Sequence, residues 1–420
     1  MRRRNIWAAL ALAGLGGLVG AGCGAAAHPA AVTNANTTTS TSTLTTTSST
    51  GAVSSTSVPK RKPVGRVVPA GGPVPVGFSP VSLSAVSSNE YWVLGTAPCH
   101  NPICTSLLRT TNGGSTFVGL PAPTSPIANG AAQGAAANGI NTIRFADQFD
   151  GYAFATGGGG GLWDTHDGGA HWAQPSFMVG HELLGFGTGS GYAFALVGSC
   201  NGNGCAEVVL ERSPVGTDIW SSLPVPFPPG IDPVADMAVR GPDLWISVTT
   251  PANTPNQLLA MSTDAGEQFA TGSSPCFSGL GGRIEAASAS VLWAICPTGM
   301  EAQALRSVDG GAHWSSLSIG KANAGSGLAN SALLAPASAT VALLEPGENG
   351  DLLRTTDGGA SWAPVTIPGG PNSWFSWIGF TDTSTGSAFR VVQEAQGSSS
   401  YQLWRTSDGG ETWSGPVRFG

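Results

Sequence analysis

The octet at residues 355–362, TTDGGASW, decides the fold because six related octets occur elsewhere in the chain. Close copies are TTNGGSTF from 110, THDGGAHW from 165, STDAGEQF from 262, SVDGGAHW from 307 and TSDGGETW from 406. A degenerate copy, SPVGTDIW from 213, keeps the first hydroxyl and the final Trp but lacks the central Asp. Successive octets start 45 to 55 residues apart. A period of this length indicates a repeat array.

Each octet has the composition of a tight turn between two strands. An Asp or Asn at the third position can accept hydrogen bonds from backbone N–H groups a few residues on. Glycine allows the positive φ that such a turn needs, and the final aromatic residue starts the next strand. The predicted turn carboxylates and amide are Asn112, Asp167, Asp264, Asp309, Asp357 and Asp408. The predicted packing aromatics are Phe117, Trp172, Trp220, Phe269, Trp314, Trp362 and Trp413.

Each interval between octets contains about four strand-like runs. In the second repeat, residues 142–145, 151–155 and 161–164 precede the octet, and a fourth run follows Trp172. Four strands per repeat, seven times over, predict an all-β, seven-bladed β-propeller of four-stranded antiparallel blades. The octets are then the turns between the third and fourth strands. Aromatic residues of the second strands are expected to pack between blades: Trp92, Phe154, Phe194, Trp245, Trp293 and Phe389.

Closure of the ring is left open by the sequence. Blade one has candidates for four strands of its own from about Val81. Residues 67–78 are also suited to an outer strand on blade seven.

The octet resembles the Asp-box, also called the bacterial neuraminidase repeat, and the resemblance extends from about residue 75 to the C-terminus. Asp-box propellers occur in sialidases, xyloglucan-degrading glycosidases, sortilin-type receptors and photosystem II assembly/stability factors. The repeat spacing and the run FADQFDGYAF at 145–154 resemble the last group more than the sialidases. The resemblance implies that the octets are structural and lie far from the ligand site.

The N-terminus has the features of an export signal. Three arginines at 2–4 precede an apolar stretch at 6–19. The following Gly-Ala-Gly-Cys resembles a bacterial lipoprotein cleavage box with Cys23 as the lipidated residue, although Gly20 stands where Leu is usual. Ordinary cleavage near residues 25–27 is the alternative. We therefore predict an exported protein held by a lipid anchor at the outer face of the membrane or cell envelope, or else secreted.

Three domains follow from composition. Residues 1–23 are the signal peptide, 24–66 a Ser/Thr-rich linker unable to bury an apolar core, and 67–420 the propeller. The chain has seven cysteines, and assigning Cys23 to lipid leaves an even number in an exported chain, which favours disulfides. The expected pairs are Cys99–Cys104, Cys200–Cys205 and Cys276–Cys296. Strand order places all three on the face opposite the octets, where they either brace a binding surface or merely staple loops.

Charge and motif content exclude several functions. Residues 1–66 have seven Lys/Arg and no acid, whereas the remainder has 11 basic and 25 acidic residues. A propeller with that negative balance is a poor binder of nucleic acid. The six histidines show no metal-ligand spacing, and the pentaglycine at 157–161 lacks the Gly-Lys-Ser/Thr of a phosphate loop. We expect no metal, no cofactor and a monomer.

Sialidase activity is the first enzymatic hypothesis that the repeat class raises. The resemblance to sialidases implies an arginine triad, a Tyr–Glu nucleophile pair and an acid/base Asp, but their Arg-Ile-Pro motif is absent. The nearest string, Arg283-Ile284-Glu285, has no Pro, and Tyr152 and Tyr192 lie in repeated strand sequences. A different carboxylate-pair glycosidase remains the alternative. Its candidate acids are Asp147, Asp236, Glu285 and Asp382.

Binding residues are predicted at two places. Four polar residues fall on innermost strands, which line the central channel: Arg144, Asp236, Arg283 and Glu285. Trp374 and Phe375 fall in the loop entering blade seven, on the face where the three cysteine pairs are expected. The alternative is that the charged residues pair with one another and the aromatics pack between blades. The sequence therefore predicts a non-catalytic propeller that binds a protein or glycan at the cell envelope, with a glycoside hydrolase as the second hypothesis.

Overall fold

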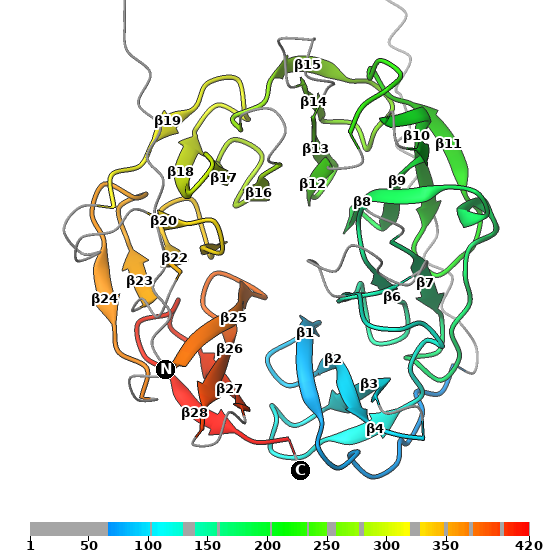
Figure 1. Cartoon of the computed structure of the whole chain (residues 1–420), viewed down its shortest axis with the longest axis vertical. Helices are drawn as coiled ribbons and strands as arrows, with labels where there is room; N and C mark the ends of the chain where they lie inside the picture. The colour runs from blue at the N-terminus through cyan, green and yellow to red at the C-terminus, as the bar shows by residue number, and fades with distance from the viewer. Residues whose placement is uncertain are drawn as a thin grey trace, which may run out of the picture. The chain divides into compact units, whose positions relative to one another are not determined.

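Seven antiparallel sheets follow one another along the chain and stand around a ring (Figure 1). The computed structural model describes residues 66–419 except 101–102, 129–138, 158–159, 202–203, 233–234, 250–257, 277–280, 320–327, 348–351, 369–372 and 395–398. The signal segment, Cys23 and linker residues 24–65 lie outside the described residues. Each sheet consists of consecutive strands, which confirms the predicted seven-bladed β-propeller. The described part has one short 3₁₀ turn, Ser176–Met178, and otherwise strands and loops.

The strand bounds show the repeat directly. Blades one to three contain β1 (Ser79–Ala85), β2 (Tyr91–Pro98), β3 (Ile103–Thr110), β4 (Val118–Leu120); β5 (Thr142–Phe145), β6 (Gly151–Phe154), β7 (Leu162–Thr165); and β8 (Glu182–Gly189), β9 (Tyr192–Asn201), β10 (Gly204–Pro214), β11 (Ser221–Pro224). Blades four and five contain β12 (Ala235–Arg240), β13 (Asp243–Val248), β14 (Leu258–Ser262), β15 (Ala270–Ser273); and β16 (Arg283–Ala286), β17 (Leu292–Pro297), β18 (Glu301–Ser307), β19 (Ser315–Ser316), with β20 (Leu328–Ala329) beside β18. Blades six and seven contain β21 (Leu333–Pro336), β22 (Ala342–Glu345), β23 (Leu352–Thr355), β24 (Ala363–Val365); and β25 (Ser373–Phe380), β26 (Gly386–Gln393), β27 (Ser399–Thr406), β28 (Ser414–Val417).

Blade two has a shortened outer edge. Its sheet has three strands, and the predicted fourth is a single bridge between Ala173 and Asp164. Pro175 follows almost at once, and proline has no N–H to extend the ladder.

The octets form the predicted turns between third and fourth strands. Thr355 Oγ1 donates to Asp357 Oδ1 at 2.8 Å, and the Ser361 amide donates to the same carboxylate oxygen at 2.9 Å. The Gly359 amide donates to Thr355 Oγ1 at 2.9 Å, with Gly359 at φ +88°. Hydrogen bonds from the Ser361 hydroxyl, the Ser361 amide and the Thr355 hydroxyl lower the pKa of Asp357 to about 2. Because every partner lies within the octet itself, the turn can be read from sequence.

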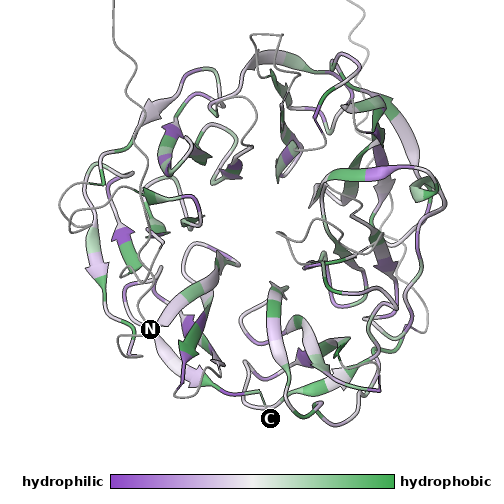
Figure 2. Ribbon diagram, in the orientation of Figure 1, coloured by the Kyte–Doolittle hydropathy of each residue, from purple (hydrophilic) through white to green (hydrophobic). Residues whose placement is uncertain are grey.

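The hydrophobic core is divided among the junctions between blades. Seven clusters of buried side chains each span two neighbouring blades, and Figure 2 shows hydrophobic residues along the strands all around the ring. Trp92 is fully buried and stacks on Phe145 of the next blade at 3.8 Å between centroids. Trp245 Nε1 donates to the Gly310 carbonyl of its next blade at 2.8 Å. The six predicted second-strand aromatics are all buried, which confirms their packing role.

Arginines reinforce the same junctions on the face that carries the octets. The residue just before an octet is Arg212, Arg354 or Arg405 in blades three, six and seven. Each guanidinium donates to the carbonyl of the fourth octet residue of the next blade, at 2.9 Å, 2.9 Å and 3.0 Å respectively. We call this contact the arginine clamp. It was not foreseen from sequence, because each partner belongs to a different repeat.

The ring closes by packing between blade seven and blade one. All four strands of blade seven come from its own repeat, and Gly72 instead bridges to Gly119 at the outer edge of blade one. The segment before β1 therefore extends blade one rather than blade seven. Phe419 contacts Phe78 and Phe117 with centroids 5.5 Å and 5.2 Å apart.

The three expected disulfides are all present: Cys99–Cys104, Cys200–Cys205 and Cys276–Cys296. The first two join the ends of β2 to β3 and of β9 to β10. The third joins the segment before β16 to the end of β17. In an antiparallel blade these ends lie opposite the turn between third and fourth strands, so the disulfides share one face. We call it the disulfide face, and the other the octet face. Such bonds are typical of chains that fold in an oxidising compartment.

Candidate binding channel

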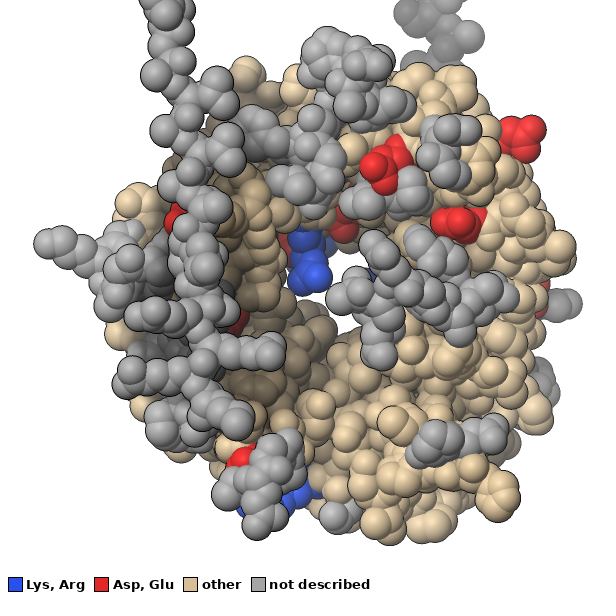
Figure 3. Space-filling model, in the orientation of Figure 1, with Lys and Arg blue, Asp and Glu red and all other residues tan. Residues whose placement is uncertain are grey.

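The first strands of the blades surround a central channel with a cavity volume of about 640 Å³. Figure 3 shows basic atoms inside the opening at the centre of the ring, with acidic atoms beside them. The charged residues of the lining come from blades two, four and five: Arg144, Asp236, Arg240, Arg283 and Glu285. The described lining from the other blades is uncharged. The channel therefore has one charged wall.

All four channel residues predicted from sequence lie in this wall, and Arg240 is an addition. Asp236, Ala238 and Arg240 alternate along β12, so their side chains share a face of the strand. That alternation is a signal by which Arg240 could have been found.

Asp236 marks the end of the channel that the disulfides brace. It lines a small recess with Cys276 and Gly282, next to the Cys276–Cys296 bond. The Ile284 amide of blade five donates to Asp236 Oδ2, so the carboxyl links blades four and five. Burial raises the pKa of Asp236 to about 7, against the effect of that hydrogen bond.

Arg144, Arg283 and Glu285 interact electrostatically without direct contact. Burial raises the pKa of Glu285, and the positive charges of Arg283 and Arg144 oppose that rise. Burial by the surrounding protein lowers the pKa of Arg144, and the negative charge of Glu285 opposes that fall. Within the described residues, however, neither Arg144 nor Arg283 makes a hydrogen bond or direct ion pair, and both are exposed to the channel. The charges of Arg144, Arg283 and Glu285 therefore interact across the channel without a direct hydrogen bond among the described residues.

The two predicted aromatic residues have different surroundings. They belong to strand β25 rather than to a loop, because this strand begins at Ser373 and runs through a bulge between Phe375 and Trp377. Trp374 is 36% exposed, whereas Phe375 is 7% exposed and packs beside the Arg390 guanidinium, 5.4 Å from its ring centroid. Trp374 is thus accessible to a ligand, and Phe375 belongs to the core.

Two of the candidate acids have structural roles at the octet face. Asp147 Oδ1 accepts hydrogen bonds from the Phe149 and Asp150 amides at 2.8 Å each. Asp382 Oδ1 accepts hydrogen bonds from the Ser384 and Thr385 amides at 2.8 Å and 2.7 Å. Both turns join first to second strands, away from the disulfide face. Of the four candidate acids, Asp236 and Glu285 remain as a neighbouring pair in the channel.

The channel arginines do not converge as an arginine triad would require. Arg283 begins β16 at the disulfide face, and Arg240 ends β12 at the octet face. A strand of this length rises roughly 16 Å from its first to its last residue. Tyr152 is 1% exposed in the core between blades two and three, where burial raises its pKa. The described channel lining contains no tyrosine.

No protein-family model and no curated protein matches the chain. Among solved structures, YCF48 bound to D1 peptide aligns with TM-score 0.47 and 17% identity over 80% of this chain and 93% of that chain. A Mycobacterium tuberculosis puromycin-hydrolyzing peptidase aligns with TM-score 0.50 and 13% identity, over 84% of this chain and 56% of that one. The GH74 xyloglucanase from Xanthomonas campestris aligns with TM-score 0.40 and 16% identity, over 80% and 66%. At these identities the similarity shows the β-propeller fold alone.

Proposed function

We propose that this chain is an exported, lipid-anchored, non-catalytic propeller that binds a protein or glycan and acts as an assembly scaffold at the cell envelope. The observation that carries the proposal is the disulfide end of the channel, where the exposed guanidinium of Arg283, which makes no direct ion pair with any described residue, lies beside a rim braced by a disulfide. Arginine is well suited to recognise carboxylates of acidic peptides or sugars, because its planar guanidinium donates two parallel hydrogen bonds. Trp374, on the strand entering blade seven, adds an aromatic surface.

Two observations support an extracytoplasmic, membrane-attached protein. The disulfides are suited to an oxidising compartment. The seventh cysteine, Cys23, follows an apolar signal-like segment. No helix in the described part of the chain is long and apolar enough to cross a membrane. The octet hydrogen bonds also support assignment of the repeats to the Asp-box class.

The described chain begins on the octet face of the propeller. Arg66 contacts Asp150 at that face, and Gly168 in the octet of blade two lies close to Val68 and Pro69.

An array experiment tests the binding proposal. Detergent-solubilised full chain is applied to a glycan array and to an array of acidic and neutral peptides. We expect capture by one class, weakened about tenfold or more in Arg283→Ala, because hydrogen bonds to a charged group are worth roughly 1.5–3 kcal/mol. Arg240→Ala, at the other end of the channel, is the matched control and should retain capture. Equal capture by Arg283→Ala and wild type would contradict the proposed site.

Membrane attachment has a separate test. We expect the wild-type chain in the membrane fraction and its Cys23→Ala variant to be released or left unprocessed, as shown by labelling with a fatty-acid probe. Equal labelling and equal membrane association of the two proteins would rule out lipidation at Cys23.

A glycoside hydrolase is the second candidate, favoured by one observation. Asp236 and Glu285 lie on neighbouring first strands, β12 and β16, in the charged wall of the channel, and burial raises the pKa of both, as a general acid requires. A screen of fluorogenic glycosides with wild type and Asp236→Asn decides between the candidates. Turnover that disappears in Asp236→Asn would overturn the non-catalytic proposal, and capture without turnover supports it.

A further inference from the structure

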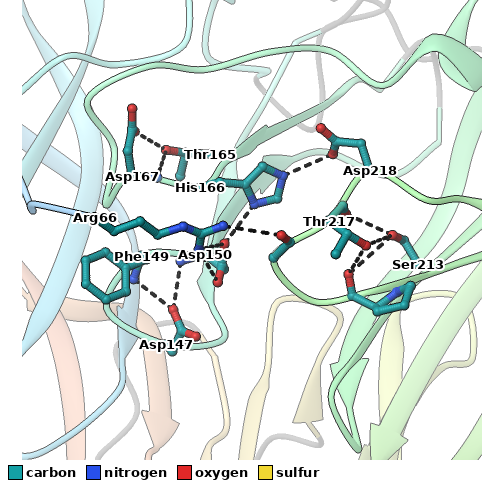
Figure 4. Close-up of polar contacts among 12 residues, drawn as sticks. Arg66, Asp147, Phe149, Asp150, Thr165, His166, Asp167, Ser213, Thr217 and Asp218 are labelled. Atoms are coloured by element: carbon teal, nitrogen blue, oxygen red, sulfur yellow. Dashed lines mark hydrogen bonds and ion pairs between the residues drawn. The ribbon is translucent and has the colours of Figure 1, made fainter. Parts of the chain in front are cut away.

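A second polar cluster lies between blades two and three on the octet face, far from the disulfide end of the channel. Asp164 is the penultimate residue of the third strand of blade two, and His166 is the second residue of that blade's octet. Asp218 lies in the degenerate octet of blade three. One potential ligand atom from each of the three lies within 4.8 Å of the other two. Figure 4 shows the His166 ring between Asp150 and Asp218.

The cluster forms where the repeat departs from its own pattern in two places. The residue before the octet is arginine in five blades: Arg109, Arg212, Arg306, Arg354 and Arg405. In blade two that position holds Asp164, and the octet that faces it, in blade three, is the degenerate copy that supplies Asp218. Two independent departures thus place two carboxylates on the two sides of one junction.

The arginine clamp of this junction is supplied by another segment. Arg66 Nη2 donates to the Gly216 carbonyl at 3.3 Å, and Gly216 is the fourth residue of the octet that begins at Ser213. Arg66 Nη1 also donates to both Asp150 carboxylate oxygens, at 3.0 Å and 3.1 Å. The clamp is therefore complete without Asp164, and the charge of Arg66 is directed to Asp150.

The hydrogen bonds of His166 leave one ring nitrogen suited to binding a metal. Nδ1 lies 2.7 Å from Asp150 Oδ1, and Asp150 is 4% exposed and held by Arg66. When a cation displaces the proton of Nε2, the Nδ1 proton stays donated to Asp150 and the Nε2 lone pair can bind the cation. Nε2 faces Asp218 Oδ1 at 3.0 Å. A carboxylate that accepts from the far nitrogen is the usual orienting partner of a metal-binding histidine.

Asp164 is the second observation that points to a cation. It is 3% exposed, and its carboxyl lies against the carboxyl of Asp218. A buried carboxylate facing another carboxylate needs a proton or a metal ion between them.

We propose that Asp164, His166 and Asp218 bind one divalent first-row transition cation of the Zn²⁺ type, with Asp150 orienting His166. One imidazole nitrogen and two carboxylate oxygens suit such an ion, whereas Ca²⁺ prefers six or more oxygen ligands. Three protein ligands leave further coordination positions to water. The side chain of Asp218 is 61% exposed, which gives the ion a route from solvent. The ion joins blade two to blade three, so its binding stabilises the folded propeller.

The test uses untagged full chain, stripped of metal with a chelator and titrated with Zn²⁺ alone by calorimetry. Ca²⁺ and Mg²⁺ serve as comparison ions. We expect one Zn²⁺ per chain and a rise in Tm that grows with Zn²⁺ concentration. We expect His166→Gln and Asp218→Asn each to weaken Zn²⁺ binding at least about tenfold. Co²⁺ in place of Zn²⁺ should give visible absorption bands that are altered in both variants.

His313→Gln is the matched control. His313 also occupies an octet, has a side chain that is 90% exposed and contacts Asp309 at 2.6 Å, but lacks further ligands nearby in the described structure. Its Zn²⁺ binding should equal that of wild type. Asp218→Asn changes an exposed side chain, so this variant keeps the test valid if His166→Gln fails to fold. Absence of Zn²⁺ binding, binding unchanged in folded Asp218→Asn, or binding lost equally in His313→Gln would each overturn the proposal.

Discussion

At the scale of the residue, the octet turn depends on a glycine for two separate reasons. Gly410 has φ +85°, a conformation that side chains with a Cβ adopt at a cost. A Cβ at Gly410 would also lie 2.8 Å from Cδ2 of Leu343, which belongs to blade six and is 1% exposed. The glycine thus serves both the turn and the approach of the neighbouring blade.

A pair of alanine substitutions separates these two effects. Gly191 has φ +78° and open space around its Cβ position, so Gly191→Ala should cost about 1 kcal/mol of folding free energy. Gly410→Ala adds overpacking and should cost about 3 kcal/mol. Chemical denaturation of both variants measures the difference. Equal loss of stability in the two variants would contradict the role of blade contact at Gly410.

At the scale of the element, blades are joined by contacts from the end of one third strand to the next octet. Arg405, at the end of β27, donates to the Gly113 carbonyl at 3.0 Å and lies over the Tyr91 ring at 4.8 Å from its centroid. Burial raises the pKa of Tyr91 to about 12, although Arg405 opposes the rise. This clamp joins the last blade to the first without exchange of a strand.

Removal of this clamp should loosen ring closure. We expect Arg405→Ala to lower the free energy of unfolding by about 2 kcal/mol, from the lost hydrogen bond and cation–π contact. Hydrogen exchange should become faster in β28 and around residues 113–119 before other blades change. Arg418→Ala, an exposed arginine near the same end of the chain, is the control and should leave exchange unaltered. Uniform acceleration across all blades in Arg405→Ala would contradict a local closing role.

At the scale of the whole molecule, two groups of carboxyls have opposite effects on stability. Burial raises the pKa of Asp236 and of Glu345 to about 7. Their unfolded forms ionise near pH 4, so folding loses stability from these groups as pH rises from about 4 to about 7. Hydrogen bonds within the octets lower the pKa of Asp309 and Asp357 to about 2. Their contribution is complete above about pH 4 and is lost as pH falls towards 2.

Together these groups predict a stability maximum near pH 4 to 5, which is acidic for a folded protein. Tm should fall as pH rises from 5 to 8, and Asp236→Asn should flatten that slope because the amide does not titrate. Differential scanning calorimetry across this range provides the measurement. A Tm that rises from pH 5 to 8, or an unchanged slope in Asp236→Asn, would show that these carboxyls do not control stability.

The whole molecule also shows what the sequence determined by itself. The period of the octets determined the seven blades, and the hydrogen bonds of each octet, such as Thr355 to Asp357, join residues within the same turn. The disulfide pairs and their common face followed from cysteine spacing and strand order. Such features are local, so a single repeat contains enough information to predict them.

Only the tertiary structure decided which residues from different repeats meet. It placed Asp218 beside His166. It brought Arg66 to the junction between blades two and three, which lacks an arginine before its octet. It buried Phe375 and left Trp374 exposed. It also left Arg144 and Arg283 without a direct ion pair to any residue that the structure describes. These contacts depend on the angle and spacing between blades around a closed ring. The repeat period fixes the number of blades but carries no information on which side chains face each other across a junction.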